Sequence, residues 1–400
     1  MDTQLRSALA FTVTVLMATA FGAAHATAGA LADLPLTLLG DRVAVVQADS
    51  GARHGLNFIV DTGASDEILD AALVKELGIT VSEPKLVPQP GGAVPVGKTT
   101  GVDIMLGGVT LKSWPFISAP LRPLEPFLGI PFDGIFGQAF LDRFVVEFDY
   151  AHGRMRLYDP ATYVYSGTGS VLALERPDGR FFIRARLEGT SRESAEGLLQ
   201  LDTGSFEALG LDGKDVKAHG LVSRGAPRVP LFGLAIGGET SGYKTRLRGV
   251  VLGPIRIERP IAAVTTSSNA GDDPLAFGVV GGEILRRFKV IVLASRKQII
   301  LEPTTALRQP FAFDANGIIL KSPRPFAHVL VHAVLENSPG ARAGLREGDE
   351  IVALDGRAVG RNGLDAAWHA LQAPDRRHQL KIRRGAGTLS LPLLTKPILQ

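Results

Sequence analysis

The feature that most constrains this chain is a three-residue signature, Asp-Thr-Gly, that occurs twice. The first copy, Asp61-Thr62-Gly63, follows the apolar run 56–60, and the second, Asp202-Thr203-Gly204, follows the apolar run 198–201. An apolar run that ends in a polar residue and a glycine is typical of a strand that leads into a tight turn. One such turn is an ordinary loop more often than a reactive site. Two copies in one polypeptide suggest a facing pair of carboxylates.

The repeat extends well beyond the signature. Downstream of each copy lies a glycine-flanked apolar pair, Ile135-Phe136 in the first and Val279-Val280 in the second. Seven residues after the closing glycine, both copies place a phenylalanine, Phe144 and Phe288, and a hairpin-like segment follows. Shared motif, spacing and flanking pattern predict two homologous lobes, each mainly β.

The composition agrees with a chain rich in strands and turns, because it contains 46 Gly and 25 Pro residues. The net charge is only +3, and no run of Lys and Arg alternates with aromatic residues, so we expect no nucleic-acid partner. There is no cysteine, which excludes disulfides, thiolate metal sites and a cysteine nucleophile.

The N-terminal segment has the pattern of a secretory signal peptide. Residues 8–20 are mostly apolar, and small residues at alternate positions follow in Ala24-His25-Ala26 and Ala26-Thr27-Ala28. We expect residues 1–28 to be removed and the protein to be periplasmic or secreted. The alternative, a membrane anchor, is disfavoured because the apolar stretch is short for a bilayer. No integral membrane segment is expected after signal removal.

The two Asp-Thr-Gly copies and their distal apolar pairs resemble the aspartic proteases of the retropepsin and pepsin type, over residues 34–304. The resemblance implies two acid-protease β-barrel lobes, at 31–160 and 161–304, with the active site between them. It also implies that Asp61 and Asp202 are the catalytic pair. Two close carboxylates share one proton, so one can activate a water while the other donates to the scissile carbonyl. Which aspartate takes which role stays open.

The resemblance also implies supporting roles for the surrounding residues. The hydroxyls of Thr62 and Thr203 would bond across the lobe junction, and Gly63 and Gly204 would let backbone N–H groups approach the carboxylates. The apolar pairs Ile135-Phe136 and Val279-Val280 would pack beneath the loops and hold them rigid. Two glycine pairs are candidate tips of substrate-covering flaps, and the alternative for each is an ordinary hairpin turn. These tips are Gly91, Gly92, Gly237 and Gly238.

After Pro303 the pattern changes. A short helix is expected to begin at Ser338-Pro339 and to end before Gly344, and Asp355-Gly356 is expected to form a tight turn. This segment resembles the PDZ domains of exported bacterial proteases and implies an α+β domain at 310–398. A PDZ domain binds an extended peptide, often its C-terminus, as an added strand. The candidate peptide-binding residues are Gly317, Ile318, Ile319, Leu320 and Phe326. The alternative is a packing domain without a ligand.

Together these features predict an exported aspartic endopeptidase that acts on polypeptide substrates without a cofactor. No metal site is expected, because the histidines of the last domain lack ligand spacing. The competing interpretation is an inactive protease fold that binds peptides as an adaptor.

Overall fold

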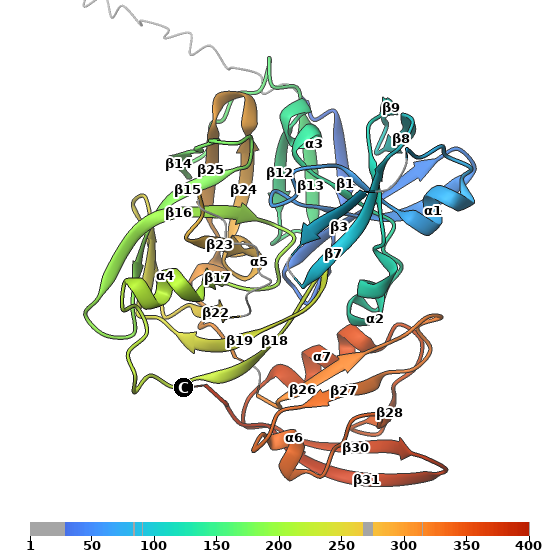
Figure 1. The fold of residues 1–400 in the computed structure, drawn as a ribbon, viewed down its shortest axis with the longest axis vertical. Helices are drawn as coiled ribbons and strands as arrows, with labels where there is room; N and C mark the ends of the chain where they lie inside the picture. The colour runs from blue at the N-terminus through green and yellow to red at the C-terminus, as the bar shows by residue number, and fades with distance from the viewer. Residues whose placement is uncertain (1–28, 83–84, 90, 267–274, 314, 400) are drawn as a thin grey trace, which may run out of the picture.

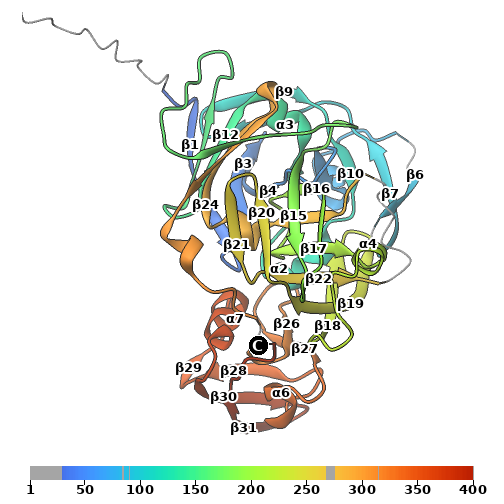
Figure 2. The same cartoon turned by 90° about the vertical axis from the view of Figure 1, so that its left-hand side faces the viewer.

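The computed structural model describes residues 29–82, 85–89, 91–266, 275–313 and 315–399, so the predicted signal peptide at 1–28 lies outside the described residues. Two β-rich lobes lie side by side, and a smaller C-terminal domain sits beneath them (Figures 1 and 2). Within the described ranges, no helix is both long and apolar enough to cross a membrane.

Lobe one is built on a ten-stranded sheet with the order β6-β7-β10-β5-β11-β4-β3-β8-β9, and β2 pairs with β3. Its strands are β2 (Thr37–Leu39), β3 (Val43–Ser50), β4 (Arg53–Val60), β5 (Ile68–Asp70), β6 (Lys85–Gln89), β7 (Gly92–Lys98), β8 (Val102–Leu106), β9 (Val109–Trp114), β10 (Ile117–Ala119) and β11 (Gly134–Phe136). Its helices are α1 (Ala71–Glu76), η1 (Arg122–Leu124), α2 (Glu125–Leu128) and α3 (Gln138–Arg143).

Lobe two is built on a nine-stranded sheet with the order β18-β19-β22-β17-β23-β16-β15-β20-β21. Its strands are β15 (Phe182–Glu188), β16 (Ser194–Asp202), β17 (Leu209–Asp212), β18 (Val229–Ala235), β19 (Gly238–Arg246), β20 (Gly249–Leu252), β21 (Ile255–Glu258), β22 (Ile261–Thr265) and β23 (Gly278–Gly281). Its helices are α4 (Gly213–Ala218) and α5 (Gly282–Leu285).

The two sheet orders correspond strand for strand, from β6 and β18 at one edge to β9 and β21 at the other. The helices that follow the equivalent strands β5 and β17 also start alike, because Asp70 accepts from two backbone N–H groups of α1 and Asp212 accepts from one of α4. The predicted pair of homologous, mainly β lobes is therefore confirmed. Among the described residues no pairing joins the end strands, so neither sheet closes into a hydrogen-bonded barrel.

A six-stranded sheet joins the two lobes, with the order β1-β13-β12-β24-β25-β14. Its strands are β1 (Ala32–Pro35), β12 (Val145–Asp149), β13 (Arg154–Tyr158), β14 (Ser170–Ala173), β24 (Phe288–Leu293) and β25 (Gln298–Pro303), and η2 (Ala294–Arg296) joins the last two. The hairpin that ends each lobe lies at its centre, where Phe148 of β12 pairs with Val290 of β24. The repeated phenylalanines, Phe144 and Phe288, are buried in the core shared by both lobes.

The C-terminal domain follows η3 (Thr305–Arg308) and has a hydrophobic core of its own. Its sheet has the order β26-β27-β28-β30-β31, with β29 beside β28. The elements are β26 (Ile318–Lys321), β27 (Leu330–Val334), α6 (Pro339–Arg342), β28 (Glu350–Leu354), β29 (Arg357–Ala358), α7 (Leu364–Gln372), β30 (Arg377–Arg384) and β31 (Gly387–Leu394). Helix α6 begins after Ser338, whose side chain caps it, as the Ser-Pro signal indicated.

Candidate active site

Two aspartates face each other where matching strands of the two lobes end. Asp61 follows β4, and Asp202 is the last residue of β16. The Gly63 N–H donates to Asp61 Oδ1 at 2.7 Å. The Gly204 N–H lies 3.1 Å from Asp202 Oδ1 and 3.3 Å from Asp61 Oδ1, so one donor reaches both carboxylates.

The two threonines of the signatures exchange hydrogen bonds across the lobe junction. The Thr62 N–H donates to Thr203 Oγ1 and the Thr203 N–H donates to Thr62 Oγ1, each at 3.0 Å. Each hydroxyl then donates to a carbonyl of the opposite lobe, Thr62 to Leu201 O at 2.8 Å and Thr203 to Val60 O at 2.7 Å. Both side chains are fully buried, so these four bonds fix the spacing of the two loops without competition from water.

Glycine is required at the third position of both signatures, because the backbone there lies very close to a carboxylate. A Cβ on Gly204 would lie 2.5 Å from Asp61 Oδ2, and a Cβ on Gly63 would lie 2.9 Å from Asp202 Cγ. Both contacts are shorter than atoms in a folded protein tolerate. No larger residue fits at either position while the aspartates keep this arrangement.

The glycine-flanked pairs lie directly beside the strands that carry the aspartates. Ile135 of β11 pairs with Ile59, and Val279 of β23 pairs with Gln200, each two residues before an aspartate. The Phe136 ring stacks on Phe58 with ring centroids 4.4 Å apart, and Phe136 O accepts from the Asp61 N–H at 2.8 Å. The first pair thus holds its loop by both packing and a backbone hydrogen bond.

Burial changes the acidity of both aspartates. It raises the pKa of Asp61 above its ordinary value. It also raises the pKa of Asp202 well above its ordinary value, and the negative charge of Asp61 raises it further. A neighbouring carboxylate makes the second ionisation costly, so the pair retains one shared proton.

Two hairpins meet at their tips, and residues of both line the cavity that contains the aspartates. A Cβ on Gly91, before β7, would lie 2.5 Å from the carbonyl of Gly238, which begins β19. A Cβ on Gly92 would lie 2.8 Å from Gly237 O. The β6–β7 and β18–β19 hairpins therefore touch at their tips, and the four glycines predicted as flap tips lie together.

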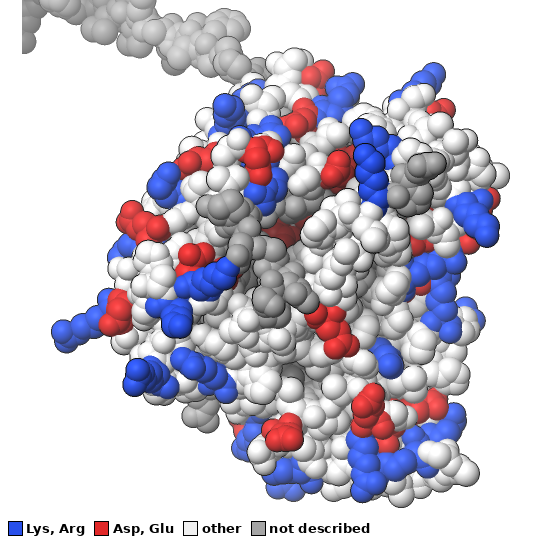
Figure 3. Space-filling model, in the orientation of Figure 1, with Lys and Arg blue, Asp and Glu red and all other residues white. Residues whose placement is uncertain are grey.

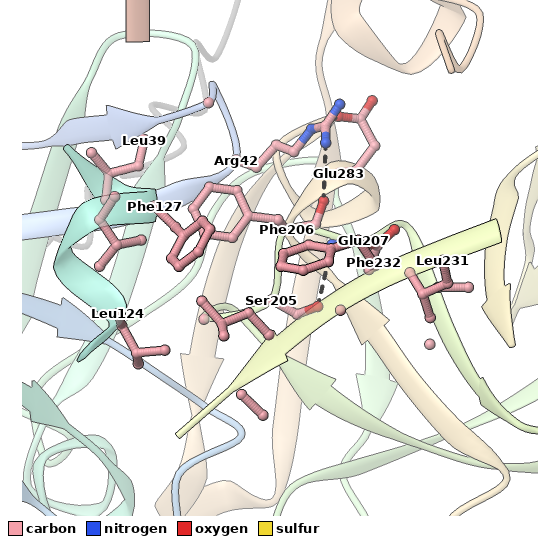
Figure 4. Close-up of a pocket in the computed structure, with 18 of the residues that line it drawn as sticks. Leu39, Arg42, Leu124, Phe127, Ser205, Phe206, Glu207, Leu231, Phe232 and Glu283 are labelled. Atoms are coloured by element: carbon pink, nitrogen blue, oxygen red, sulfur yellow. Dashed lines mark hydrogen bonds and ion pairs between the residues drawn. The ribbon is translucent and has the colours of Figure 1, made fainter. Parts of the chain in front are cut away.

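The space enclosed by the lobes and these hairpins, the interlobe cavity, has a volume of about 670 Å³. Its lining includes both aspartates, the hairpin residues Gln89 and 231–236, and the aromatic side chains of Phe127, Phe206 and Phe232. Figure 4 shows these rings near one another, with the ion pair of Arg42 and Glu283 beside them (2.6 Å). In the view of Figure 3, the surface is hollowed between the lobes, and acidic and basic side chains are interspersed around the hollow.

Two family models match parts of the chain, one within lobe one and one within the C-terminal domain. Residues 43–140 match the aspartyl protease model, and residues 330–384 match a PDZ domain model. The chain combines an aspartyl protease domain with a PDZ domain. The resemblance inferred from the sequence motifs is therefore confirmed.

Among solved structures, the aspartic proteinase from Irpex lacteus is similar to this chain, with 15% identity and a TM-score of 0.43. The match covers 69% of this chain and 98% of that one. No curated protein matches the chain.

The structure separates the residues predicted for the PDZ groove. Ile318, Ile319 and Leu320 of β26 line the interlobe cavity, and Gly317 directly precedes them. Phe326 does not line it, because its side chain is buried in the turn between β26 and β27. Of the residues predicted for the groove, those of β26 therefore line the cavity and Phe326 does not.

One acidic residue near the site has no counterpart in the sequence repeat. Glu67 is buried, and its carboxylate accepts from the N–H groups of Gly137 and Phe140, both at 2.9 Å. It thereby caps α3, which has no side-chain cap of its own, and ties the Asp61 loop to the glycine-flanked pair. Burial raises the pKa of Glu67 to about 7.

Lobe two lacks this carboxylate. Ile68 lies opposite Ile135, and Gly210 lies opposite Val279, so the lobe-two equivalent of Glu67 is the buried Leu209. Comparison of the two repeats therefore gives no signal for Glu67. Among the described residues, no cluster of His, Asp and Glu has the arrangement to hold a metal ion.

Proposed function

We propose that this protein is an aspartic endopeptidase in which Asp61 and Asp202 activate a water for attack on a peptide bond. The observation that carries the proposal is the pair itself. Two half-buried carboxylates share one N–H donor, are fixed by four buried threonine hydrogen bonds, and line a cavity large enough for a peptide segment.

The mechanism follows from the shared proton. The ionised carboxylate accepts a proton from water as the water oxygen attacks the scissile carbonyl carbon. The protonated carboxyl group donates to the carbonyl oxygen, which acquires negative charge as the tetrahedral intermediate forms. Collapse of that intermediate breaks the C–N bond, and a proton from the pair passes to the leaving nitrogen. The two carboxyl groups end with one shared proton, as they began.

Activity is expected to fall as the pH rises through the upper pKa of the pair. The protonated partner is then lost, and no group remains to donate to the carbonyl oxygen. Burial and the charge of Asp61 raise the pKa of Asp202, so activity persists to a higher pH than two ordinary carboxyl groups would allow.

The test is digestion of a peptide library by the mature protein across a range of pH. The double variant Asp61→Asn/Asp202→Asn serves as the control, and pepstatin as the inhibitor. Pepstatin-sensitive cleavage in the wild type alone supports the proposal. If wild type and double variant bind peptides equally and neither cleaves, the protein is an adaptor that uses a protease fold to hold polypeptides.

Export is part of the same proposal and rests on the signal-peptide pattern at 1–28. A protein exported in this way would meet unfolded polypeptides in the periplasm or outside the cell. Fractionation of expressing cells and N-terminal sequencing of the mature protein test it. A protein that keeps its first residues and stays in the cytoplasm would contradict it.

A further inference from the structure

The interlobe cavity does not end at the two aspartates. Its lining continues onto the PDZ domain, along Ile318 to Leu320 of β26 and along α7. On α7 the lining residues include Leu364, Trp368 and Gln372, which are four residues apart and therefore lie on one face of the helix. The PDZ domain turns that face and its first strand toward the aspartates.

Strand β26 is the free edge of the PDZ sheet, because β27 is its only partner strand among the described residues. The Ile318 N–H donates to Asn316 Oδ1 at 2.7 Å, and the Ser322 N–H donates to Pro126 O at 2.6 Å, both away from β27. Since backbone groups alternate along a strand, the main chain of Leu320 faces the same outer edge. Within the described residues it has no partner there, so an incoming strand could pair with it.

The protease itself bounds this groove. Helix α2 of lobe one supplies Pro126 at the Ser322 end, and a Cβ on Gly129 would lie only 3.0 Å from the Leu364 side chain. At the other end, Asn316 Nδ2 donates to Leu371 O at 3.0 Å and joins β26 to α7. Residues of β26 and α7 line the same cavity as the aspartates, so the space between these two elements is continuous with the interlobe cavity.

Direct contacts hold the PDZ domain against lobe one. The Gly40 N–H donates to Asp365 Oδ1 at 3.0 Å, and Asp41 pairs with His369 at 2.8 Å. The buried Glu125 pairs with Arg324 at 2.6 Å. Figures 1 and 2 show α7 and β26 beneath α2 and close to the β18–β19 hairpin. The position of the groove relative to the aspartates is therefore set by docking as well as by the linker.

We infer that β26 and α7 form the distal part of the substrate cleft, so that one extended polypeptide occupies the PDZ groove and the paired aspartates together. This inference rests on the proposed protease function. The substrate is an unstructured polypeptide that adds a strand to β26 and carries an aromatic or aliphatic side chain away from the scissile bond. Phe127, Phe206 and Trp368 supply the apolar surface that such a side chain would contact.

The decisive experiment compares one joined peptide with its separate parts. The first sample is a short fluorogenic peptide chosen from the library digestion. The second is the same peptide joined, at its N- or C-terminal side, to an arm of alternating Thr, Val and Phe residues. The third is the short peptide with the free arm added. If one chain bridges both sites, linkage raises the effective concentration, and kcat/KM of one joined peptide exceeds that of the short peptide by at least about 10-fold.

Variants on the two edges of the PDZ sheet localise the effect. Ile319 lines the cavity from β26 and is half-buried, whereas Leu389 is exposed on β31, at the opposite edge. Ile319→Asp is expected to lower the ratio of joined to short kcat/KM toward one, through KM, and Leu389→Asp is expected to preserve it.

Three results would overturn the inference. The free arm could stimulate cleavage as much as the joined arm, which would make the PDZ domain a regulator rather than a subsite. The second result is a kcat/KM for both joined peptides that is no higher than that of the short peptide. The third is an Ile319→Asp variant that keeps the wild-type ratio of joined to short kcat/KM. If no peptide is cleaved, the proposed function fails instead. The inference is then decided by fluorescence anisotropy, in which Ile319→Asp must weaken binding of a joined peptide and Leu389→Asp must not.

Discussion

At the scale of single residues, the threonine exchange at the lobe junction determines how closely the aspartates are held. Thr203→Val removes the acceptor for the Thr62 N–H and the donor to Val60 O, and leaves both groups buried without partners. Each unsatisfied group costs about 1–3 kcal/mol, and the loosened loops should lower kcat on the order of 100-fold. Urea denaturation and steady-state kinetics measure the two effects.

A matched control exists in the PDZ domain. Thr395 is equally buried, and its hydroxyl likewise accepts from one N–H, that of Arg376, and donates to a carbonyl, Ala373 O at 2.7 Å. Thr395→Val should lower stability by a similar amount but leave kcat on a short peptide within a few-fold of wild type. An equal loss of kcat in both variants would show that the junction has no special role.

Glu67 should make stability depend on pH. Its pKa is raised in the folded state, so the stability that its protonation contributes is present below the unfolded value near 4.5 and is lost as pH rises through about 7. The full change in unfolding free energy from this group is on the order of 3 kcal/mol. Glu67→Gln should therefore flatten the fall in unfolding free energy between pH 5 and pH 8, measured by chemical denaturation.

Glu283 provides the opposite case. Burial opposes its ionisation, but the charges of Arg42 and Arg286 hold the pKa of Glu283 below its ordinary value. The contribution of ionised Glu283 to folding stability is thus present above pH 4.5 and is lost as the pH falls. Glu283→Gln should destabilise the protein at neutral pH and less so in acid. If the unfolding free energies of Glu67→Gln and Glu283→Gln depend on pH in the same way, the raised pKa of Glu67 is contradicted.

Sequence reasoning located the aspartates, threonines and glycines because each occurs twice at matching spacing. It missed Glu67, because lobe two has Leu209 at that position. Only residues present in both copies stand out when the two repeats are compared. It also missed Gln200, whose side chain donates to Gly63 O at 2.9 Å and braces the opposite loop. A residue that acts in only one lobe leaves no trace in a comparison of the two.

At the scale of elements, the contact between the two hairpin tips should control access to the aspartates. Gly91 has a positive φ of 90° and lies against Gly238, so Gly91→Ala combines backbone strain with a clash at the partner tip. The expected result is a higher KM and a lower kcat/KM, by roughly 10-fold or more, because the flap cannot close fully.

Gly108 separates the clash from the backbone strain. It also has a φ of 90°, at the turn between β8 and β9, but a Cβ there would meet no atom within 4 Å. Gly108→Ala should lose similar stability and keep wild-type KM. If the two variants have the same kinetics, the tip contact is not part of substrate binding.

Periodicity and turn signals predicted several elements, including the helix that begins at Ser338-Pro339, which is α6, and the closing hairpins of both lobes. They could not predict how the strands of different lobes pair. The central sheet depends on β12 meeting β24, a contact between segments about 140 residues apart in sequence that no local pattern encodes. For the same reason, the sequence placed Ile318 to Leu320 in a PDZ groove but not in the cavity that the aspartates line.

At the scale of the whole molecule, the pair of Glu125 and Arg324 should hold the PDZ domain against lobe one. Arg324→Ala leaves the buried Glu125 carboxylate without its cationic partner, although the Phe132 N–H still donates to it at 2.9 Å. We expect a loss on the order of 2 kcal/mol in docking and a larger radius of gyration in small-angle X-ray scattering.

An exposed pair inside the PDZ domain serves as the control. Arg383 bonds Glu350 at 2.7 Å and is about as exposed as Arg324. Arg383→Ala should leave the radius of gyration unchanged. If Arg324→Ala also leaves it unchanged, the PDZ domain is held by its other contacts, and Glu125 is not a docking residue.

The central claim is that the two half-buried aspartates, one from each lobe, hydrolyse peptide bonds together. Its most direct test is kcat/KM of purified Asp61→Asn and Asp202→Asn on the best library peptide, with folding checked by circular dichroism. Each variant should lose activity by at least about 1000-fold while remaining folded, because neither role in the pair can be supplied by an amide. Cleavage at near wild-type rates by either folded variant would contradict the claim.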